Sequence, residues 1–190
     1  AFVLGDLGPT GQLLEPMGTL SRADAAAAYA EQVAALVTGG IDGIIIETMS
    51  DLEETRAAIE GARRVTDLPI LVTMSFDTHG RTMMGVDPAR AARELWAMDV
   101  AVVGANCGRS LPENLEAIRK MREAVPSARL MAKPNAGMPH VSGDAVVYDV
   151  TPEVMAEYGL RFADLGVKII GSCCGSGPEH IQALATALRA

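Results

Sequence analysis

The sequence predicts an α/β fold built from parallel βαβ units, and three observations carry this prediction. First, six short apolar runs recur at intervals of ~25 to 40 residues, and each is followed by a segment of helix-forming character. Second, these runs are continuous rather than alternating, as in parallel strands that are buried on both faces. Third, polar residues and thiols gather where the runs end, which is the catalytic edge in barrels of alternating strands and helices.

The expected strands are the apolar runs, each bounded by a glycine, a proline or a polar residue. In chain order they cover residues 2–4, 41–47, 69–74, 100–106, 129–133 and 167–170. A loop rich in Gly and Pro, residues 7–19, follows the first strand. None of the strands is followed by a G-x-G-x-x-G or G-x-x-x-x-G-K-S/T motif, so a nucleotide site is not predicted.

The expected helices follow from capping residues that precede an acidic residue or a proline in the first turn. The expected caps are Ser21, Ser50, Asp87, Ser110 and Thr151. The helices are expected over residues 25–37, 50–65, 87–98, 110–124, 151–165 and 178–188. A small hairpin is expected within residues 138–150, around Gly143. His180, near the start of the last helix, is expected to be a surface or capping residue rather than a metal ligand.

Length and composition bound the class of protein. At 190 residues and 49% hydrophobic content, the chain predicts a single domain over residues 1–190. The formal net charge of −8 argues against nucleic acid, and no apolar segment reaches the ~18 to 20 residues of a membrane span. Three cysteines, two of them adjacent, make a poor disulfide framework, so we expect a reducing, cytoplasmic location. Because the chain opens with Ala1 directly before a strand, we expect it to be part of a longer polypeptide.

All three thiols lie at strand ends: Cys107 follows the fourth strand, and Cys173 and Cys174 follow the sixth. Adjacent thiols on a regular strand would point to opposite faces, so the chain must bend for both to reach one ion, and Gly171 and Gly175 permit a bend. Soft thiolates select zinc, and a catalytic zinc takes three protein ligands and leaves one position open. The alternatives are buried structural cysteines or a closed structural zinc site, and the lack of a fourth cysteine favours the catalytic site.

Two short motifs carry these cysteines: Gly-Ala-Asn-Cys at 104–107 and Gly-Ser-Cys-Cys-Gly-Ser-Gly-Pro-Glu-His-Ile at 171–181. Four others accompany them: Gly-Asp-Leu-Gly-Pro-Thr-Gly at 5–11, Asp-Gly-Ile-Ile-Ile-Glu-Thr at 42–48, Ser-Phe-Asp at 75–77 and Pro-Asn-Ala-Gly at 134–137. Together they resemble the homocysteine S-methyltransferase family, most closely the homocysteine-binding module of cobalamin-dependent methionine synthase, from residue 2 to about residue 188. Ser172 departs from the usual glycine, and we expect this small side chain to preserve the bend.

The resemblance implies a (β/α)8 TIM-type barrel, which needs about 250 residues when complete. In the family the zinc ligands lie on the sixth and eighth strands, so placing Cys107 and the Cys173-Cys174 pair there makes the predicted units the third to the eighth. The homocysteine-binding barrel domain over residues 1–190 is then expected to lack its first two βα units. In the family the loop after the first strand helps to hold the substrate carboxylate, so no residue here is assigned that task.

The resemblance also implies zinc-dependent methyl transfer to the thiol of homocysteine, which is activated as a zinc thiolate and converted to methionine. The implied methyl donor is methylcobalamin on another domain or chain. The implied partners are cobalamin-binding and methyltetrahydrofolate-binding domains or chains. Two alternatives stay open: another thiol S-methyltransferase that uses betaine, S-methylmethionine or S-adenosylmethionine, and a truncated module that binds zinc or a partner without turnover. An isolated fragment is expected to show low activity.

Four polar residues at strand ends are candidate substrate contacts. The resemblance assigns Glu47 to the substrate ammonium, held through a charge-assisted hydrogen bond, while the alternative is an acid that interacts with the dipole of the following helix. Asp6, Asn106 and Asn135 are the other candidates. Asp6 could instead cap its loop, and the two asparagines could be turn residues or could support the metal ligands.

Overall fold

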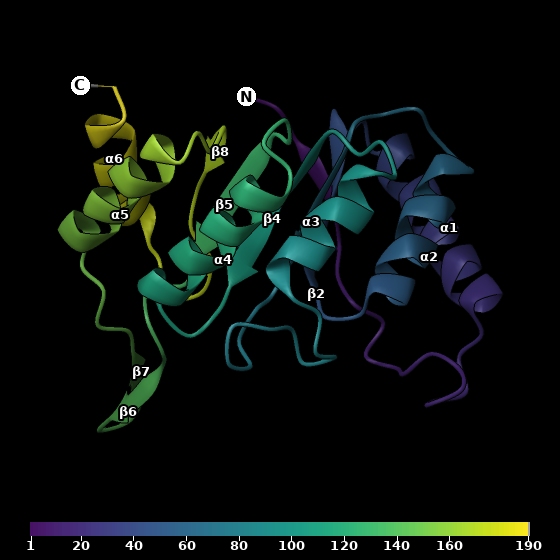
Figure 1. Ribbon diagram of the computed structural model, residues 1–190, viewed down its shortest axis with the longest axis horizontal. Helices are drawn as coiled ribbons and strands as arrows, with labels where there is room; N and C mark the ends of the chain where they lie inside the picture. The colour runs from purple at the N-terminus through teal and green to yellow at the C-terminus, as the bar shows by residue number, and fades with distance from the viewer. Residues whose placement is uncertain (190) are drawn as a thin grey trace.

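The computed structural model describes residues 1–189, and its main feature is one parallel six-stranded sheet (Figure 1). The sheet order β1-β2-β3-β4-β5-β8 follows the chain order. Its strands are β1 (Leu4–Leu7), β2 (Gly43–Met49), β3 (Ile70–Met74), β4 (Val102–Cys107), β5 (Leu130–Pro134) and β8 (Ile169–Ile170). Six helices connect or follow them: α1 (Arg22–Thr38), α2 (Leu52–Arg63), α3 (Pro88–Trp96), α4 (Leu111–Ala124), α5 (Pro152–Asp164) and α6 (Pro178–Ala187). This arrangement is a partial TIM-type barrel, which confirms the predicted α/β class.

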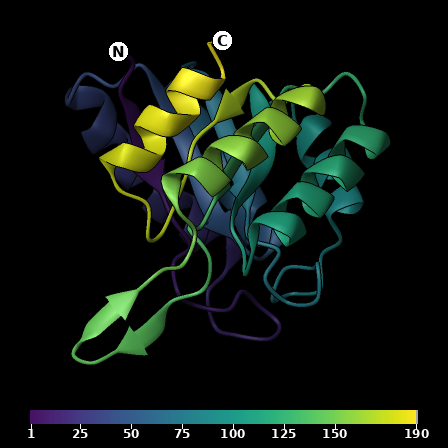
Figure 2. The same ribbon diagram turned by 90° about the vertical axis from the view of Figure 1, so that its left-hand side faces the viewer.

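The predicted hairpin is also present, as a separate two-stranded antiparallel sheet of β6 (His140–Ser142) and β7 (Ala145–Val147). Figure 2 shows it extending away from the body of the molecule, on the path from β5 to α5. Within residues 1–189, no helix is both long enough and apolar enough to cross a membrane. The numbering of the six units as third to eighth stays a prediction.

The first strand is displaced from its predicted position. β1 covers Leu4–Leu7 because these four residues pair in parallel register with β2, from Leu4 opposite Gly43 to Leu7 opposite Ile46. Phe2, which we predicted to begin the strand, is 86% exposed and lies before the paired segment. Asp6 therefore lies inside the strand rather than just beyond its end.

Most of the predicted helix caps are confirmed. Ser21, Ser110 and Thr151 each accept a hydrogen bond from a backbone N–H of the first turn, and Asp87 does the same before Pro88. The prediction of Ser50 as a cap was wrong. Asp51, one residue later, is the cap of α2, because its carboxylate accepts the Glu53 N–H at 2.9 Å.

The two faces of the sheet differ in what covers them. The face toward the helices contributes fully buried aliphatic side chains, including Ile44, Ile46 and Val72, to the main core. On the inner face, alternate residues form a smaller apolar layer of Ile45, Leu71, Val102 and Met131, which are 3–6% exposed. Toward the C-terminal ends of the strands, the inner face becomes polar. This change places the candidate site at the edge that the sequence predicted.

Candidate metal centre

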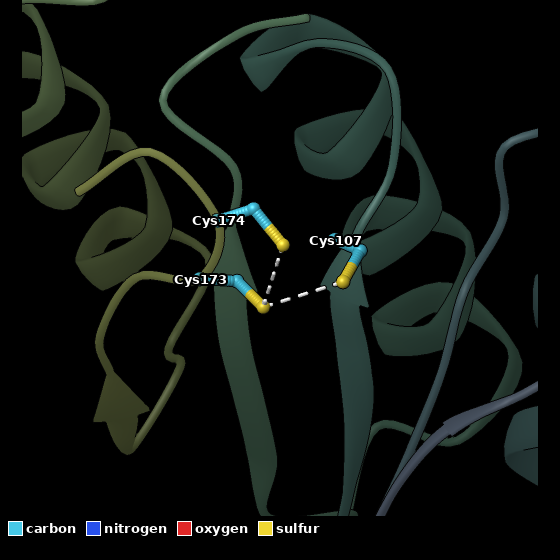
Figure 3. A group of neighbouring side chains, drawn as sticks. All are labelled: Cys107, Cys173 and Cys174. Carbon is cyan, nitrogen blue, oxygen red and sulfur yellow. Dashed lines mark hydrogen bonds between the residues drawn. The ribbon is translucent and has the colours of Figure 1, made fainter. Parts of the chain in front are cut away.

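Three cysteine side chains, one at the end of β4 and two in the turn after β8, converge at the C-terminal edge of the sheet (Figure 3). The Sγ atom of Cys173 lies 3.2 Å from that of Cys107 and 4.0 Å from that of Cys174. All three sulfur atoms lie within 4.8 Å of one another. A tetrahedral zinc with Zn–S bonds of ~2.3 Å places its sulfur ligands ~3.8 Å apart, so the residues fit this ion. Their assignment as metal ligands stays a prediction.

The backbone turns sharply at both cysteine loops. Cys107 has a left-handed conformation, with φ of 54°, and the Asn114 side-chain amide donates to its carbonyl at 3.2 Å. Gly175 has φ of 80°, and a Cβ atom at this position would lie 2.2 Å from the ring of Tyr148. Gly175 is therefore required by both conformation and packing. Gly171 adopts no such conformation and a Cβ atom there would make only an ordinary contact, so of the two glycines that we expected to permit the bend, only Gly175 has a backbone that favours glycine.

The end of β5 holds the Cys173-Cys174 turn in place through backbone and side-chain hydrogen bonds. The Cys173 N–H donates to the Pro134 carbonyl at 2.8 Å, and the Cys174 carbonyl accepts the Ala136 N–H at 2.9 Å. Asn135 joins both cysteine loops, because its Oδ1 accepts the Cys174 N–H and its Nδ2 donates to the Gly108 carbonyl, both at 3.0 Å. The predicted role of Asn135 in substrate contact stays a prediction, but its part in supporting the thiols is direct.

Asn106 is fully buried and its amide orients toward sulfur. Its Oδ1 accepts hydrogen bonds from the Thr48 N–H at 2.8 Å and from the Thr73 hydroxyl at 2.7 Å. Its Nδ2 donates to the Thr48 hydroxyl at 2.8 Å and to Cys107 Sγ at 3.2 Å. These bonds fix which end of the amide faces the thiols. Sequence reasoning missed Thr48 and Thr73, whose contribution depends on the pairing of neighbouring strands.

The three thiols have different electrostatic environments. A hydrogen bond from Cys107, followed by the Cys174 backbone N–H and the Asn106 amide, lowers the pKa of Cys173 despite its partial burial. The pKa of Cys107 is raised because it donates this hydrogen bond, and burial adds to the effect. Burial, followed by the charge of Cys173, raises the pKa of Cys174. The pKa shifts differ in direction because the three thiols interact as one cluster.

A second group of side chains, the charged triad of Asp6, Glu47 and Lys133, lies on the same inner face. The Lys133 ammonium forms an ion pair with the Glu47 carboxylate, and their side chains are 21% and 19% exposed. Asp6 is an exposed residue, yet partial burial of its carboxyl raises its pKa, the nearby Glu47 raises it further, and Lys133 opposes the shift. Sequence reasoning missed Lys133. Its place on β5, directly opposite Asn106, emerges only from the strand register.

A cavity of about 470 Å³ opens beside the thiols. Cys107 and Cys174 line it, together with Asp77, Asn135 and Tyr148. His180 does not join this site. Its ring is 7% exposed, its Nδ1 accepts the Gly177 N–H at 3.0 Å and its Nε2 lies 2.9 Å from the Val150 carbonyl. The predicted capping role of His180 is confirmed, although the residue is buried rather than on the surface.

Comparison with known proteins places the chain in a family. The family model described as homocysteine S-methyltransferase matches residues 1–188, and the chain therefore belongs to that family. Proteins named methionine synthase from Mycobacterium leprae (strain TN) and Mycobacterium tuberculosis (strain ATCC 25618 / H37Rv) are 30% and 31% identical to the chain over 98% of its length. The chain spans 16% of each of these relatives.

Solved structures support the fold. The homocysteine methyltransferase MmuM from Escherichia coli, in its apo form, is 22% identical, with a TM-score of 0.76 over 98% of this chain and 62% of its own. The metallated form of the same enzyme has a TM-score of 0.73 at 21% identity and covers all of this chain and 61% of its own.

Proposed function

We propose that this chain is the homocysteine-binding, zinc-bearing part of a methyltransferase that produces methionine. The observation that carries this proposal is the convergence of Cys107, Cys173 and Cys174 within 4.8 Å, beside a charged triad at the same edge of the sheet. Membership of the homocysteine S-methyltransferase family supports the acceptor. The existence of a metallated form of the E. coli enzyme supports a metal at the thiols.

Zinc is the metal that the three thiols fit, and when bound it would supply the Lewis acidity that deprotonates an incoming thiol at neutral pH. The chain's own residues perform the other tasks. Asn106 donates an N–H to the Cys107 sulfur, and Asn135 holds the backbone of both cysteine turns by donating to the Gly108 carbonyl and accepting the Cys174 N–H. The Glu47 carboxylate binds the substrate ammonium by accepting charge-assisted hydrogen bonds from it, and Asp6 adds a second negative charge to the same region.

The methyl donor that we propose is methylcobalamin, held by another domain or chain. The support is that two relatives named methionine synthase are about six times as long as this chain, which covers 16% of each. Cobalamin-binding and methyltetrahydrofolate-binding domains or chains are accordingly the proposed partners. A reducing cytoplasm is the proposed location, because three neighbouring free thiols would oxidise elsewhere.

Calorimetric titration of the zinc-loaded protein tests the proposal with two ligands that differ in one atom. Homocysteine is expected to bind with release of a proton, whereas homoserine, which carries a hydroxyl in place of the thiol, is expected to bind at least tenfold more weakly because oxygen is a poorer partner for a thiolate-rich zinc. Equal affinities for the two ligands would show that the thiol does not reach the cysteine cluster.

A further inference from the structure

The ion pair between Lys133 and Glu47 occupies the carboxylate that the proposed function assigns to the substrate ammonium. Lys133 extends from β5 and Glu47 from β2, which lie on either side of β3 and β4 in the sheet, so the pair spans the inner face. Both side chains are about four-fifths buried. Glu47 therefore already binds one alkylammonium group, and that group belongs to the protein.

The charges around this pair do not balance. Asp6 and Glu47 carry two negative charges and Lys133 carries one positive charge, while the Asp6 carboxylate has no ion-pair partner among residues 1–189. The excess negative charge attracts a positively charged group, such as the ammonium of a ligand. A ligand that brought only an ammonium to Glu47 would, however, leave Lys133 four-fifths buried without its partner, which is costly for a charged group.

We propose that Lys133 binds the α-carboxylate of the substrate while Glu47 binds its α-ammonium, an inference that rests on the proposed function. An α-amino acid carries both charges on one carbon atom, so its binding replaces one internal ion pair with two intermolecular ones. Neither Lys133 nor Glu47 is left without a partner in this exchange. The substrate class is thus a thiol with a zwitterionic α-amino acid group, and the pair selects against thiols that lack either charge.

The position of Lys133 suits this task. It pairs with Asn106 across the sheet, one residue before Pro134, whose carbonyl holds the Cys173 N–H at 2.8 Å. The lysine proposed to bind the carboxylate and the turn that carries Cys173 are therefore attached to the same strand end. Gly171 opposite its stem carries no side chain, which leaves the four-carbon stem of Lys133 free to turn from Glu47 toward a ligand.

Three ligands separate this inference from the proposed function when they are titrated into the zinc-loaded protein. Homocysteine carries both charges, 3-aminopropanethiol lacks the carboxylate and 4-mercaptobutyrate lacks the ammonium. In Lys133→Met, the affinities for homocysteine and 4-mercaptobutyrate are expected to fall by about tenfold to a hundredfold, while that for 3-aminopropanethiol stays equal or rises. Lys133→Arg, which keeps the charge, is expected to retain most of the affinity.

Two control variants remove a positive charge elsewhere. Lys168→Met alters an exposed lysine just before β8, at the N-terminal ends of the strands and away from the thiols, and is expected to bind all three thiols like the parent protein. Arg109→Met removes an exposed arginine that lines the cavity beside the thiols. A carboxylate-dependent loss in Arg109→Met but not in Lys133→Met would overturn the inference and assign the task to Arg109.

The remaining outcomes are also decisive. If Lys133→Met weakens all three thiols alike, or weakens only the two that carry an ammonium, then Lys133 merely positions Glu47 and the inference fails while the proposed function survives. If the parent protein binds none of the three thiols, the proposed function fails as well. Lys133→Gln repeats the test with an uncharged polar group at the end of the side chain. The zinc content of each variant verifies that the thiol site is intact.

Discussion

The two ends of the inner face of the sheet are built from opposite kinds of residue. At the C-terminal ends of the strands lie the three thiols and the charged triad, and hydrogen bonds with Asn106 and Asn135 hold the cysteines in place. At the N-terminal ends lies an apolar cavity of about 350 Å³ lined by Phe2, Leu4 and Ile169, all of which are exposed. The comparison teaches that one end gathers thiols and charged side chains, whereas the other end is mainly apolar, with Asp42 as the charged residue of its cavity lining.

The largest effect is expected at the thiols. Cys107→Ala removes one of three ligands from the proposed zinc site, and zinc affinity is expected to fall by more than about a hundredfold, beyond the range typical of changes in supporting residues. Competition with a chromophoric chelator measures the affinity. If Cys107→Ala kept the zinc affinity and stoichiometry of the parent protein, the assignment of Cys107 as a ligand would be wrong.

The second prediction concerns the charged triad at the same end. Glu47→Gln keeps the size of the side chain but loses the charge, so homocysteine binding is expected to weaken by about 1.5 to 3 kcal/mol while zinc stays bound. Calorimetric titration on the zinc-loaded variant measures both quantities. Exposed Glu31, on α1, provides the matched control, because Glu31→Gln removes the same charge outside the site. Unchanged affinity in Glu47→Gln would mean that Glu47 acts only as an acid before α2.

Much of this end of the molecule could be predicted from sequence, because strand ends are local features. The cysteines, Glu47 and the asparagines all stand where an apolar run stops, and parallel strands bring such residues to one edge. Lys133 was missed for a physical reason. It lies within an apolar strand, and its pairing with Glu47 depends on the curvature of the sheet and on strand register across three intervals, which no local pattern encodes.

The errors in the predicted secondary structure have a similar origin. The apolar run at residues 2–4 predicts a strand, but hydrogen bonding to β2 selects Leu4–Leu7 instead, and Asp6 moves into the sheet as a result. Ser50 and Asp51 are both good helix caps by residue type. The structure selects Asp51 because β2 continues to Met49 and leaves the next residue to turn the chain.

A smaller effect is expected from a residue that supports the thiols without contributing sulfur. Asn135→Ala removes the hydrogen bonds to the Cys174 N–H and the Gly108 carbonyl, so the two cysteine loops lose a direct connection. Zinc affinity is expected to fall by about tenfold to a hundredfold, less than in Cys107→Ala. Chelator competition on both variants gives the comparison. If Asn135→Ala reduces homocysteine affinity but leaves zinc affinity unchanged, the residue contacts substrate instead.

The smallest effect on the site is expected from the apolar end, where a change should alter association alone. Phe2 is 86% exposed and stands beside the open edge of β1, which makes it a contact for another apolar surface. We expect the 190-residue chain to self-associate at high concentration, and Phe2→Ser to weaken association by about tenfold to a hundredfold, since burying such a side chain stabilises by about 1.5 to 3 kcal/mol. Val141→Ser is the matched control, because Val141 is 77% exposed but lies on the hairpin at a distance from this cavity.

Sedimentation velocity over a range of concentrations measures association, and chelator competition should return the zinc affinity of the parent protein for both variants. Equal weakening by the two substitutions would show that association does not use the open end of the sheet, and loss of zinc in Phe2→Ser would show that the two ends are coupled through the apolar layer between them.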